Sequence, residues 1–199
     1  MPSALVRDLR SLPNLITLSR IVLVLVAAVL FFTSSRVVAL AIAVVAALTD
    51  YLDGIVARAT GQVTRLGEIL DQFSDLFFES LCLVLAISAG FLSPLVLVAY
   101  LFRELWVMTI RRFMAGERLH IASNIVGKLK TNALMWSFLP TFVSIGGLWP
   151  AAEPTLTRVG QAGIGIGLLL SFWSGASYTR QFLRGYETVA ARASRSDSP

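Results

Sequence analysis

Four aspartates in a mostly apolar part of the chain are the residues whose type and spacing could do chemistry. Together with four neighbours they form the pattern D-x2-D-G-x2-A-R-x8-G-x3-D-x3-D, which consists of Asp50, Asp53, Gly54, Ala57, Arg58, Gly67, Asp71 and Asp75. Carboxylates are costly inside an apolar bundle unless cations compensate their charge. Such oxygen clusters suit Mg²⁺ or Mn²⁺, and two of these ions can hold both the attacking and the leaving oxygen of a phosphoryl group.

The spacing predicts two helices whose inner faces carry these carboxylates. At about 3.6 residues per turn, Asp50 and Asp53 share one helical face with the small residues Gly54 and Ala57. On the next helix a second stripe recurs at every fourth residue, and it consists of Gly67, Asp71 and Asp75. A short connection makes the two helices antiparallel neighbours. We therefore expect the four aspartates to converge and to bind two divalent ions.

The other members of the pattern suit a ligand that carries phosphate. Gly54, Ala57 and Gly67 leave room beside the backbone, where a Leu or Phe would fill the groove. Arg58 supplies a permanent positive charge for a phosphate. A purely structural alternative is that the small residues only allow close packing while the aspartates pair with Arg58 and Arg65. Two arginines, however, do not balance four buried carboxylates.

The composition indicates an all-α integral membrane protein. Of the 199 residues, 56% are hydrophobic and 15% are charged, and the mean hydropathy is +0.74. Apolar runs near the length of about 20 residues that crosses a bilayer predict six transmembrane helices, at 15–33, 37–57, 68–90, 94–115, 125–148 and 159–183.

The two ends of the chain have a different character from these apolar runs. Leu5, Leu9 and Leu12 predict a short N-terminal amphipathic helix on the membrane surface, with an ordinary basic flank as the alternative. We treat residues 1–185 as one transmembrane domain. Residues 186–199 are expected to form a disordered cytoplasmic tail.

The positions of Lys and Arg predict the orientation in the membrane. Most of them fall at or near one side of the predicted bundle, whereas the other side has only Arg36 and Arg158. Both termini and the aspartates are therefore expected at the cytoplasmic face of the cell membrane. The expected partners are membrane lipid and small substrates, with no nucleic acid.

A second group of residues, C-terminal to the aspartates, predicts an anion site. It comprises Arg103, Arg111, Arg112, Arg118, Ser123, Lys128 and Lys130. Arg103 lies deep for a residue that only marks topology, which favours a pocket for the phosphate of an acceptor. Setting topology and meeting anionic lipid remain alternatives for each single cation.

Two further expectations concern packing inside the bundle. Glu79 continues the aspartate stripe by one turn, and we expect it to pair with Arg103, the alternatives being Glu104 or the metal site. In the last helix, small residues recur at every fourth position, and we interpret them as marks of close helix packing: Gly163, Gly167, Ser171 and Gly175.

The aspartate pattern resembles the motif of the CDP-alcohol phosphotransferases. These membrane enzymes move a substituted phosphate from a CDP-linked alcohol to an acceptor hydroxyl and release CMP. The resemblance implies six transmembrane helices, a homodimer, two metal ions held by the four aspartates, and Asp75 as the general base. It also implies that the CDP end of the donor binds at Asp50, Asp53, Gly54, Ala57, Arg58 and Gly67.

Within that family, further segments are similar to the bacterial phosphatidylglycerophosphate synthases. They are the stretch 13–17 with Arg20, the pair at 103–104, and S-x3-G-K-x-K-T at 123–131. This resemblance implies CDP-diacylglycerol as donor and glycerol 3-phosphate as acceptor. Gln72 and Leu76 depart from it, because a proline and a lysine are usual there.

Other functions remain open at this point. The same chemistry could use inositol phosphate, or phosphatidylglycerol as in a cardiolipin synthase. A divalent-cation transporter is a remote alternative, because it would need carboxylates near the bilayer midplane and polar residues on both sides.

Overall fold

The computed structural model describes the backbone of residues 4–33, 35–60, 64–117, 119 and 125–196. Within these ranges the side chains of residues 4, 5, 7, 50–55, 57–60, 128 and 190–196 are not described. The described backbone is helical and contains no strand, which confirms the all-α class. Its elements are α1 (Ala4–Leu9), α2 (Leu12–Thr33), α3 (Arg36–Thr60), α4 (Arg65–Ser88), α5 (Pro94–Gly116), α6 (Ile125–Ile145), the 3-10 turn η1 (Pro150–Ala152) and α7 (Glu153–Ser196).

The six long helices correspond to the six apolar runs of the sequence, and α1 corresponds to the predicted N-terminal helix. Among the described residues, two stretches are long and apolar enough to cross a bilayer, Leu12–Thr33 and Pro150–Val189. Arg36–Thr49 is a shorter apolar stretch. The number of membrane spans therefore stays a prediction.

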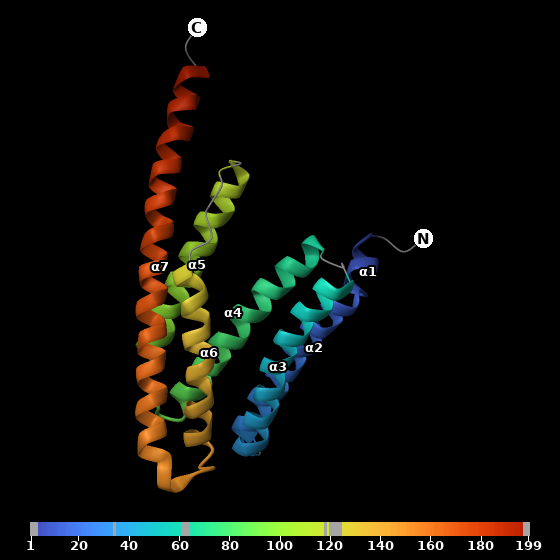
Figure 1. Cartoon of the computed structure of the whole chain (residues 1–199), viewed down its shortest axis with the longest axis vertical. Coiled ribbons are helices and arrows are strands. Elements are labelled where there is room, and N and C mark those ends of the chain that lie inside the picture. The colour runs from blue at the N-terminus through green and yellow to red at the C-terminus, as the bar shows by residue number, and fades with distance from the viewer. Residues whose placement is uncertain (1–3, 34, 61–63, 118, 120–124, 197–199) are drawn as a thin grey trace.

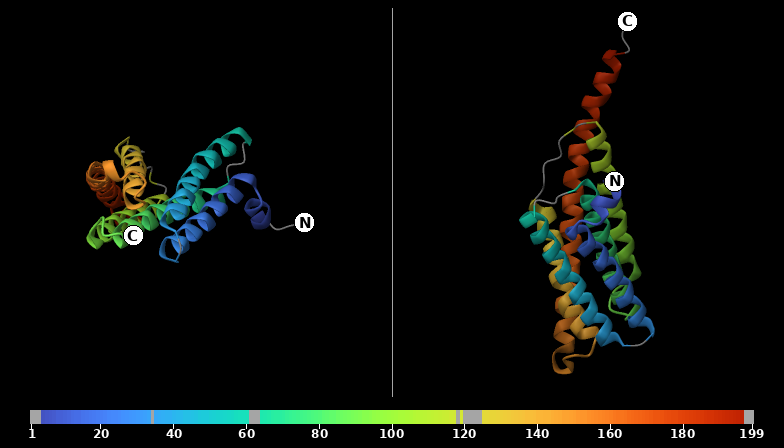
Figure 2. Two further views of the ribbon diagram at one scale, coloured as in Figure 1. Left: turned by 90° about the horizontal axis from the view of Figure 1, so that it is seen from below. Right: turned by 90° about the vertical axis from the view of Figure 1, so that its right-hand side faces the viewer.

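Two helix pairs and a diagonal helix make up the architecture (Figure 1). The helices α2 and α3 pack side by side as one pair, and α6 and α7 form the other, with α5 against α7. The diagonal helix α4 contacts α2, α5 and α6 and so connects the two pairs. The left view of Figure 2 shows the same two groups from below. The C-terminal end of α7 lies at the top of Figure 1, and α1 lies lower, at the upper end of the α2–α3 pair.

Local sequence signals explain where α4 and α5 begin. The hydroxyl of Thr64 caps α4 by accepting a hydrogen bond from the backbone N–H of Gly67 at 3.0 Å. At the start of α5, Ser93 accepts from Leu95 and the next residue, Pro94, occupies the first turn. Gly90 has φ of 75° in the intervening turn, a conformation that favours glycine. Gly90, Ser93 and Pro94 together fix the turn between α4 and α5.

The last helix is longer than predicted. It has 44 residues and ends at Ser196, whereas residues 186–199 were expected to be a disordered tail. Most of that segment is helical, so this expectation was wrong. The physical reason is that a helix already formed propagates readily through good helix formers. Ala190, Ala191 and Ala193 are such residues.

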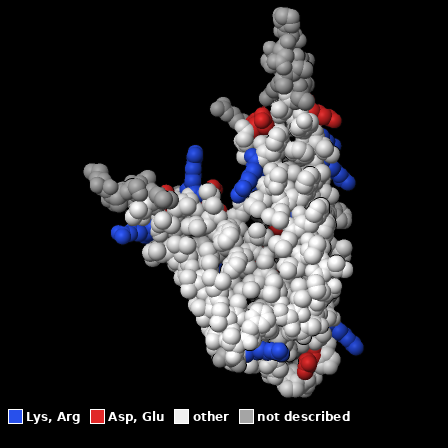
Figure 3. Space-filling view, turned by 180° about the vertical axis from the view of Figure 1, so that it is seen from behind, with Lys and Arg blue, Asp and Glu red and all other residues white. Residues whose placement is uncertain are grey.

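Large apolar side chains are exposed along the outside of the bundle. Leu95, Trp136, Leu169 and Trp173 each have more than two thirds of their surface exposed, at 74%, 74%, 73% and 71%. Charged side chains lie toward the two ends of the face in Figure 3, and a broad, nearly uncharged band separates them. An apolar belt of this extent suits contact with lipid. The protein is a membrane protein.

Close packing of α6 and α7 depends on glycines. A Cβ atom added at Gly163 would collide with the hydroxyl of Ser137, and one at Gly167 would lie 2.8 Å from a methyl carbon of Leu134. The predicted packing role of these two glycines is confirmed. Gly160 belongs to the same contact, because an added Cβ would collide with the hydroxyl of Thr141 and lie 3.2 Å from its backbone nitrogen.

We expect Gly160→Ala to lower the free energy of unfolding by about 1–3 kcal/mol, because the methyl group meets backbone that cannot move aside. The control is Gly165→Ala on the same helix, where an added Cβ meets nothing within 4 Å. That variant should be neutral or more stable by up to about 1 kcal/mol. Thermal unfolding in detergent, followed by circular dichroism, measures both. Equal midpoints for the two variants would contradict the packing role.

Candidate functional site

A buried arginine from α2 holds two of the four aspartates. The guanidinium of Arg20 contacts Oδ1 of Asp75 at 2.8 Å and Oδ1 of Asp71 at 3.2 Å. The Arg20 side chain is 1% exposed, whereas the side chains of Asp71 and Asp75 are 54% and 48% exposed. Arg20 therefore forms ion pairs with both carboxylates from inside the bundle and fixes their orientation, while the carboxylates remain in contact with solvent. From the sequence, Arg20 was noted only beside the stretch 13–17, because nothing in its spacing pairs it with residues more than fifty positions away.

The other two aspartates lie on α3. Asp50, Asp53, Gly54, Ala57 and Arg58 belong to the C-terminal half of that helix, and their side chains lie outside the described residues. Among the described residues α3 and α4 both pack on α2, so the predicted direct interface between α3 and α4 stays a prediction. No group of three or more metal-binding side chains occurs in the described part of the chain.

The space beside Gly67 is used by the protein itself. The Asn14 amide donates hydrogen bonds to the backbone oxygen of Asp8 at 2.8 Å and to the hydroxyl of Thr64 at 3.2 Å. A Cβ atom at Gly67 would lie only 2.6 Å from Oδ1 of Asn14. Gly67 thus allows α1, α2 and the start of α4 to meet. Its role beside the CDP donor stays a prediction.

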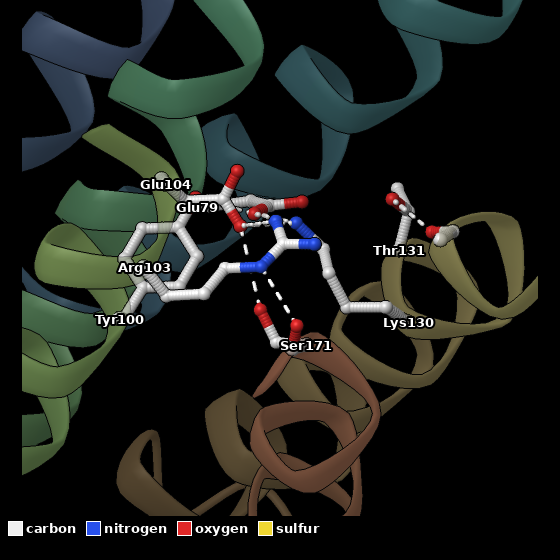
Figure 4. Close-up of polar contacts among 8 residues, drawn as sticks. Glu79, Tyr100, Arg103, Glu104, Lys130, Thr131 and Ser171 are labelled. Carbon is white, nitrogen blue, oxygen red and sulfur yellow. Dashed lines mark hydrogen bonds and ion pairs between the residues drawn. The ribbon is translucent and has the colours of Figure 1, made fainter. Parts of the chain in front are cut away.

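Beneath the aspartates, a charged network joins three helices (Figure 4). The Lys130 ammonium on α6 contacts the Glu104 carboxylate at 2.7 Å and the Glu79 carboxylate at 3.7 Å. The hydroxyl of Tyr100 donates to Glu79 at 2.5 Å, and Lys130 also lies 5.7 Å from the centre of the Tyr100 ring. One cation is therefore shared by two acidic side chains, and a phenol supplies the remaining hydrogen bond to the buried Glu79.

Arg103 extends this network to α7. Its guanidinium contacts Glu104 at 2.6 Å, and its Nε donates to the backbone oxygen of Ser171 at 2.7 Å. The expected pairing of Glu79 with Arg103 was wrong. Glu79 pairs with Lys130 and Tyr100, while Arg103 pairs with the neighbouring Glu104. The reason is geometric, since α6 places Lys130 between the two glutamates and leaves Arg103 to face α7.

An open cavity of about 640 Å³ is lined by residues of α4, α5, α6 and α7, and the members of this charged network form part of its lining. Asp75 lines it together with three of the predicted anion-binding residues, Arg103, Arg111 and Lys130. The structure therefore brings the end of the aspartate stripe and part of the basic cluster onto one cavity. Gln72 and Leu76 also line the cavity. These are the two positions at which the sequence differs from the residues usual in the phosphatidylglycerophosphate synthases.

The remaining members of the predicted anion site are placed differently. Arg112 is exposed and does not line the cavity. Arg118 and Ser123, and the side chain of Lys128, lie outside the described residues. Two α7 residues that the sequence did not single out for the site, Ser174 and Tyr178, do line the cavity. No motif marks them, because only the packing of α7 on α5 and α6 turns them inward.

The chain is similar to known proteins of one family. Residues 10–173 match the model of the CDP-alcohol phosphatidyltransferase family. Similar proteins carry the name CDP-diacylglycerol–glycerol-3-phosphate 3-phosphatidyltransferase. Those of Pectobacterium atrosepticum and Yersinia enterocolitica are 31% and 32% identical, and that of Shigella flexneri is 30% identical. Each match covers 84% of this chain and 92% of the relative.

We expect Lys130→Met to lower the free energy of unfolding by about 3 kcal/mol, because the buried Glu79 and the partly buried Glu104 lose their shared cation. The control Arg184→Met removes the same charge from an exposed position on α7 and should change stability by less than about 0.5 kcal/mol. The midpoint of thermal unfolding in detergent measures the difference. If both variants unfold at the same temperature, Lys130 does not hold the network together.

Proposed function

The chain belongs to the CDP-alcohol phosphatidyltransferase family, and from that premise we propose that it transfers a phosphatidyl group from CDP-diacylglycerol to glycerol 3-phosphate. The products are phosphatidylglycerophosphate and CMP. The names of the similar proteins support this choice of substrates. The observation that carries it is the cavity in which Asp75 and the cation Arg111 line the same space.

The proposed layout in the cell membrane has six spanning helices, α2 to α7, with both termini and the cavity on the cytoplasmic side. The distribution of Lys and Arg supports this orientation. The uncharged band of Figure 3 supports the placement of the bundle in lipid. A homodimer, which the family resemblance implies, is part of the same proposal.

The carboxylates fit a pair of divalent ions. Asp71 and Asp75 present hard oxygen donors one turn apart on α4, and both are about half exposed. With Asp50 and Asp53 on α3 they would hold two Mg²⁺ or Mn²⁺ ions, which such donors prefer. When bound, the ions would neutralise charge on the diphosphate of the donor. Gly54, Ala57, Arg58 and Gly67 would accommodate the CDP part.

The reaction exchanges one phosphorus–oxygen bond for another. The acceptor hydroxyl oxygen attacks the phosphorus that carries diacylglycerol, and the bond from that phosphorus to the CMP oxygen breaks. Asp75 takes the proton of the attacking hydroxyl as general base. Arg20 keeps the Asp75 carboxylate turned in one direction through the 2.8 Å contact, so that the base is oriented before the acceptor arrives.

Arg111 is the proposed main contact for the acceptor phosphate. Lys130 and Arg103 also line the cavity, but glutamates already contact both of them. Among the described cavity residues, Arg111 is the cation with no acidic partner. A guanidinium can bind two phosphate oxygens at once, which positions the acceptor as well as attracting it. Arg118, Ser123 and Lys128 are proposed to complete the site.

We expect purified protein with CDP-diacylglycerol, Mg²⁺ or Mn²⁺ and glycerol 3-phosphate to release CMP. Asp75→Asn should slow this release by at least about 100-fold, since the general base is lost. Glu117→Gln, the same change at the exposed end of α5, should leave the rate unaltered. Inositol phosphate and phosphatidylglycerol complete the acceptor panel. No CMP with any acceptor, from folded protein, would refute the proposed transfer.

Adjacent arginines allow a second test of the acceptor site. We expect Arg111→Met to raise the KM for glycerol 3-phosphate about tenfold or more, because a charged hydrogen bond to phosphate is lost. Arg112→Met removes the same charge from the next residue in the chain, which does not line the cavity, and should change this KM less than about twofold. Steady-state kinetics at saturating CDP-diacylglycerol measure both. Similar KM values for the two variants would count against the contact.

A further inference from the structure

One wall of the cavity carries a hydroxyl that has no partner. Ser174 on α7 is 0% exposed, and its Oγ makes no hydrogen bond although it lines the cavity. A buried hydroxyl without a hydrogen bond is unfavourable. The backbone contact of Arg103 with Ser171 fixes the rotation of α7 and so keeps Ser174, three residues later, on the cavity side.

A second hydroxyl and a glycine stand beside it. Tyr178, one turn further along α7, is 9% exposed and lines the same wall, and among the described residues its hydroxyl makes no hydrogen bond. Gly127 on α6 faces both groups. A Cβ atom there would lie 3.5 Å from Oγ of Ser174 and 3.9 Å from the Tyr178 hydroxyl. The missing side chain leaves space directly in front of the two hydroxyls.

The charge of this wall distinguishes it from the rest of the cavity. Ser174 and Tyr178 are neutral groups that both donate and accept hydrogen bonds. The cations of the cavity are supplied by α5 and α6 instead. Ser174 and Tyr178 also lie beyond residue 173, where the family match ends. The wall therefore suits an uncharged hydroxyl better than a phosphate.

We propose that Ser174 and Tyr178 bind the acceptor hydroxyl that does not react, in the space in front of Gly127. This rests on the proposed transfer to glycerol 3-phosphate, which has one attacking hydroxyl, one secondary hydroxyl and one phosphate. With the phosphate at Arg111 and the attacking hydroxyl at Asp75, the secondary hydroxyl meets the α7 wall. The wall is thereby a specificity determinant for a polyol phosphate over a simple alcohol phosphate.

The test compares two buried serines that both lack a hydrogen-bond partner. Ser174→Ala should raise the KM for glycerol 3-phosphate about three- to tenfold, the effect of one lost neutral hydrogen bond. Its KM for CDP-diacylglycerol should stay unaltered. Ser74→Ala is the matched control, because Ser74 is 1% exposed and equally unpartnered but does not line the cavity. An unaltered acceptor KM in Ser174→Ala would overturn the proposal.

Two acceptors identify the bound group. The monophosphate of 1,3-propanediol has the phosphate and a primary hydroxyl but lacks the secondary hydroxyl. The wild-type protein should use it less well than glycerol 3-phosphate, and Ser174→Ala should cause no further loss with it. An equal loss with both acceptors would overturn the assignment, since the serine would then contact the phosphate that they share.

Gly127→Ala tests the space itself without removing either hydroxyl. The methyl group makes only ordinary contacts, so the variant should unfold at an unaltered or higher temperature. It should nevertheless raise the KM for glycerol 3-phosphate, because the methyl fills the space in front of the wall. An unaltered KM in this variant would overturn the proposed position.

If the wild-type protein releases no CMP with any acceptor, both the proposed transfer and the role of the α7 wall are refuted. If the wild-type protein is active but Ser174→Ala and Ser74→Ala have the same acceptor KM, only the role of the α7 wall is refuted.

Discussion

A carboxylate inside an apolar bundle has to meet a cation or a hydrogen-bond donor, and in this protein the partner usually comes from another helix. Arg20 ties α2 to α4 through Asp71 and Asp75. Lys130 ties α6 to α4 and α5 through Glu79 and Glu104. The relative positions of these four helices follow from a few ionic contacts, because lipid-facing apolar side chains supply little driving force for one particular arrangement.

The same contacts prepare the cavity for an anionic substrate. Glu79 and Glu104 hold Lys130 in place before any ligand binds, so little reorganisation is needed when charge arrives. Arg111 lines the same cavity and, among the described residues, forms no ion pair with these acids. Stability and binding are thus divided between cations of the same cavity. Those held by glutamates tie the helices together, and the one with no acidic partner among the described residues is the one proposed to bind the acceptor phosphate.

Much of the helical layout could be predicted from the sequence, because apolar runs and turn residues are local signals. The aspartate stripe on α4 was also visible, since helical periodicity places Asp71 and Asp75 on one face. Contacts between distant helices were not. The partner of Glu79 depends on how α6 passes between α4 and α5, and periodicity within one helix carries no information about that. The ion pairs of Arg20 with Asp71 and Asp75 were missed for the same reason.

The helical end of α7 was also missed, because a polar, alanine-containing segment has no apolar stripe that requires packing. At about 1.5 Å per residue, the 44 residues of this helix extend for about 65 Å, roughly twice the thickness of a hydrocarbon core. A straight rod of that length cannot be submerged in one bilayer. At least one end of this helix therefore extends beyond the hydrocarbon core, while the same helix carries Ser174 in the wall of the cavity. Because the helix is continuous from Glu153 to Ser196, a displacement of its outer end would be transmitted to that wall.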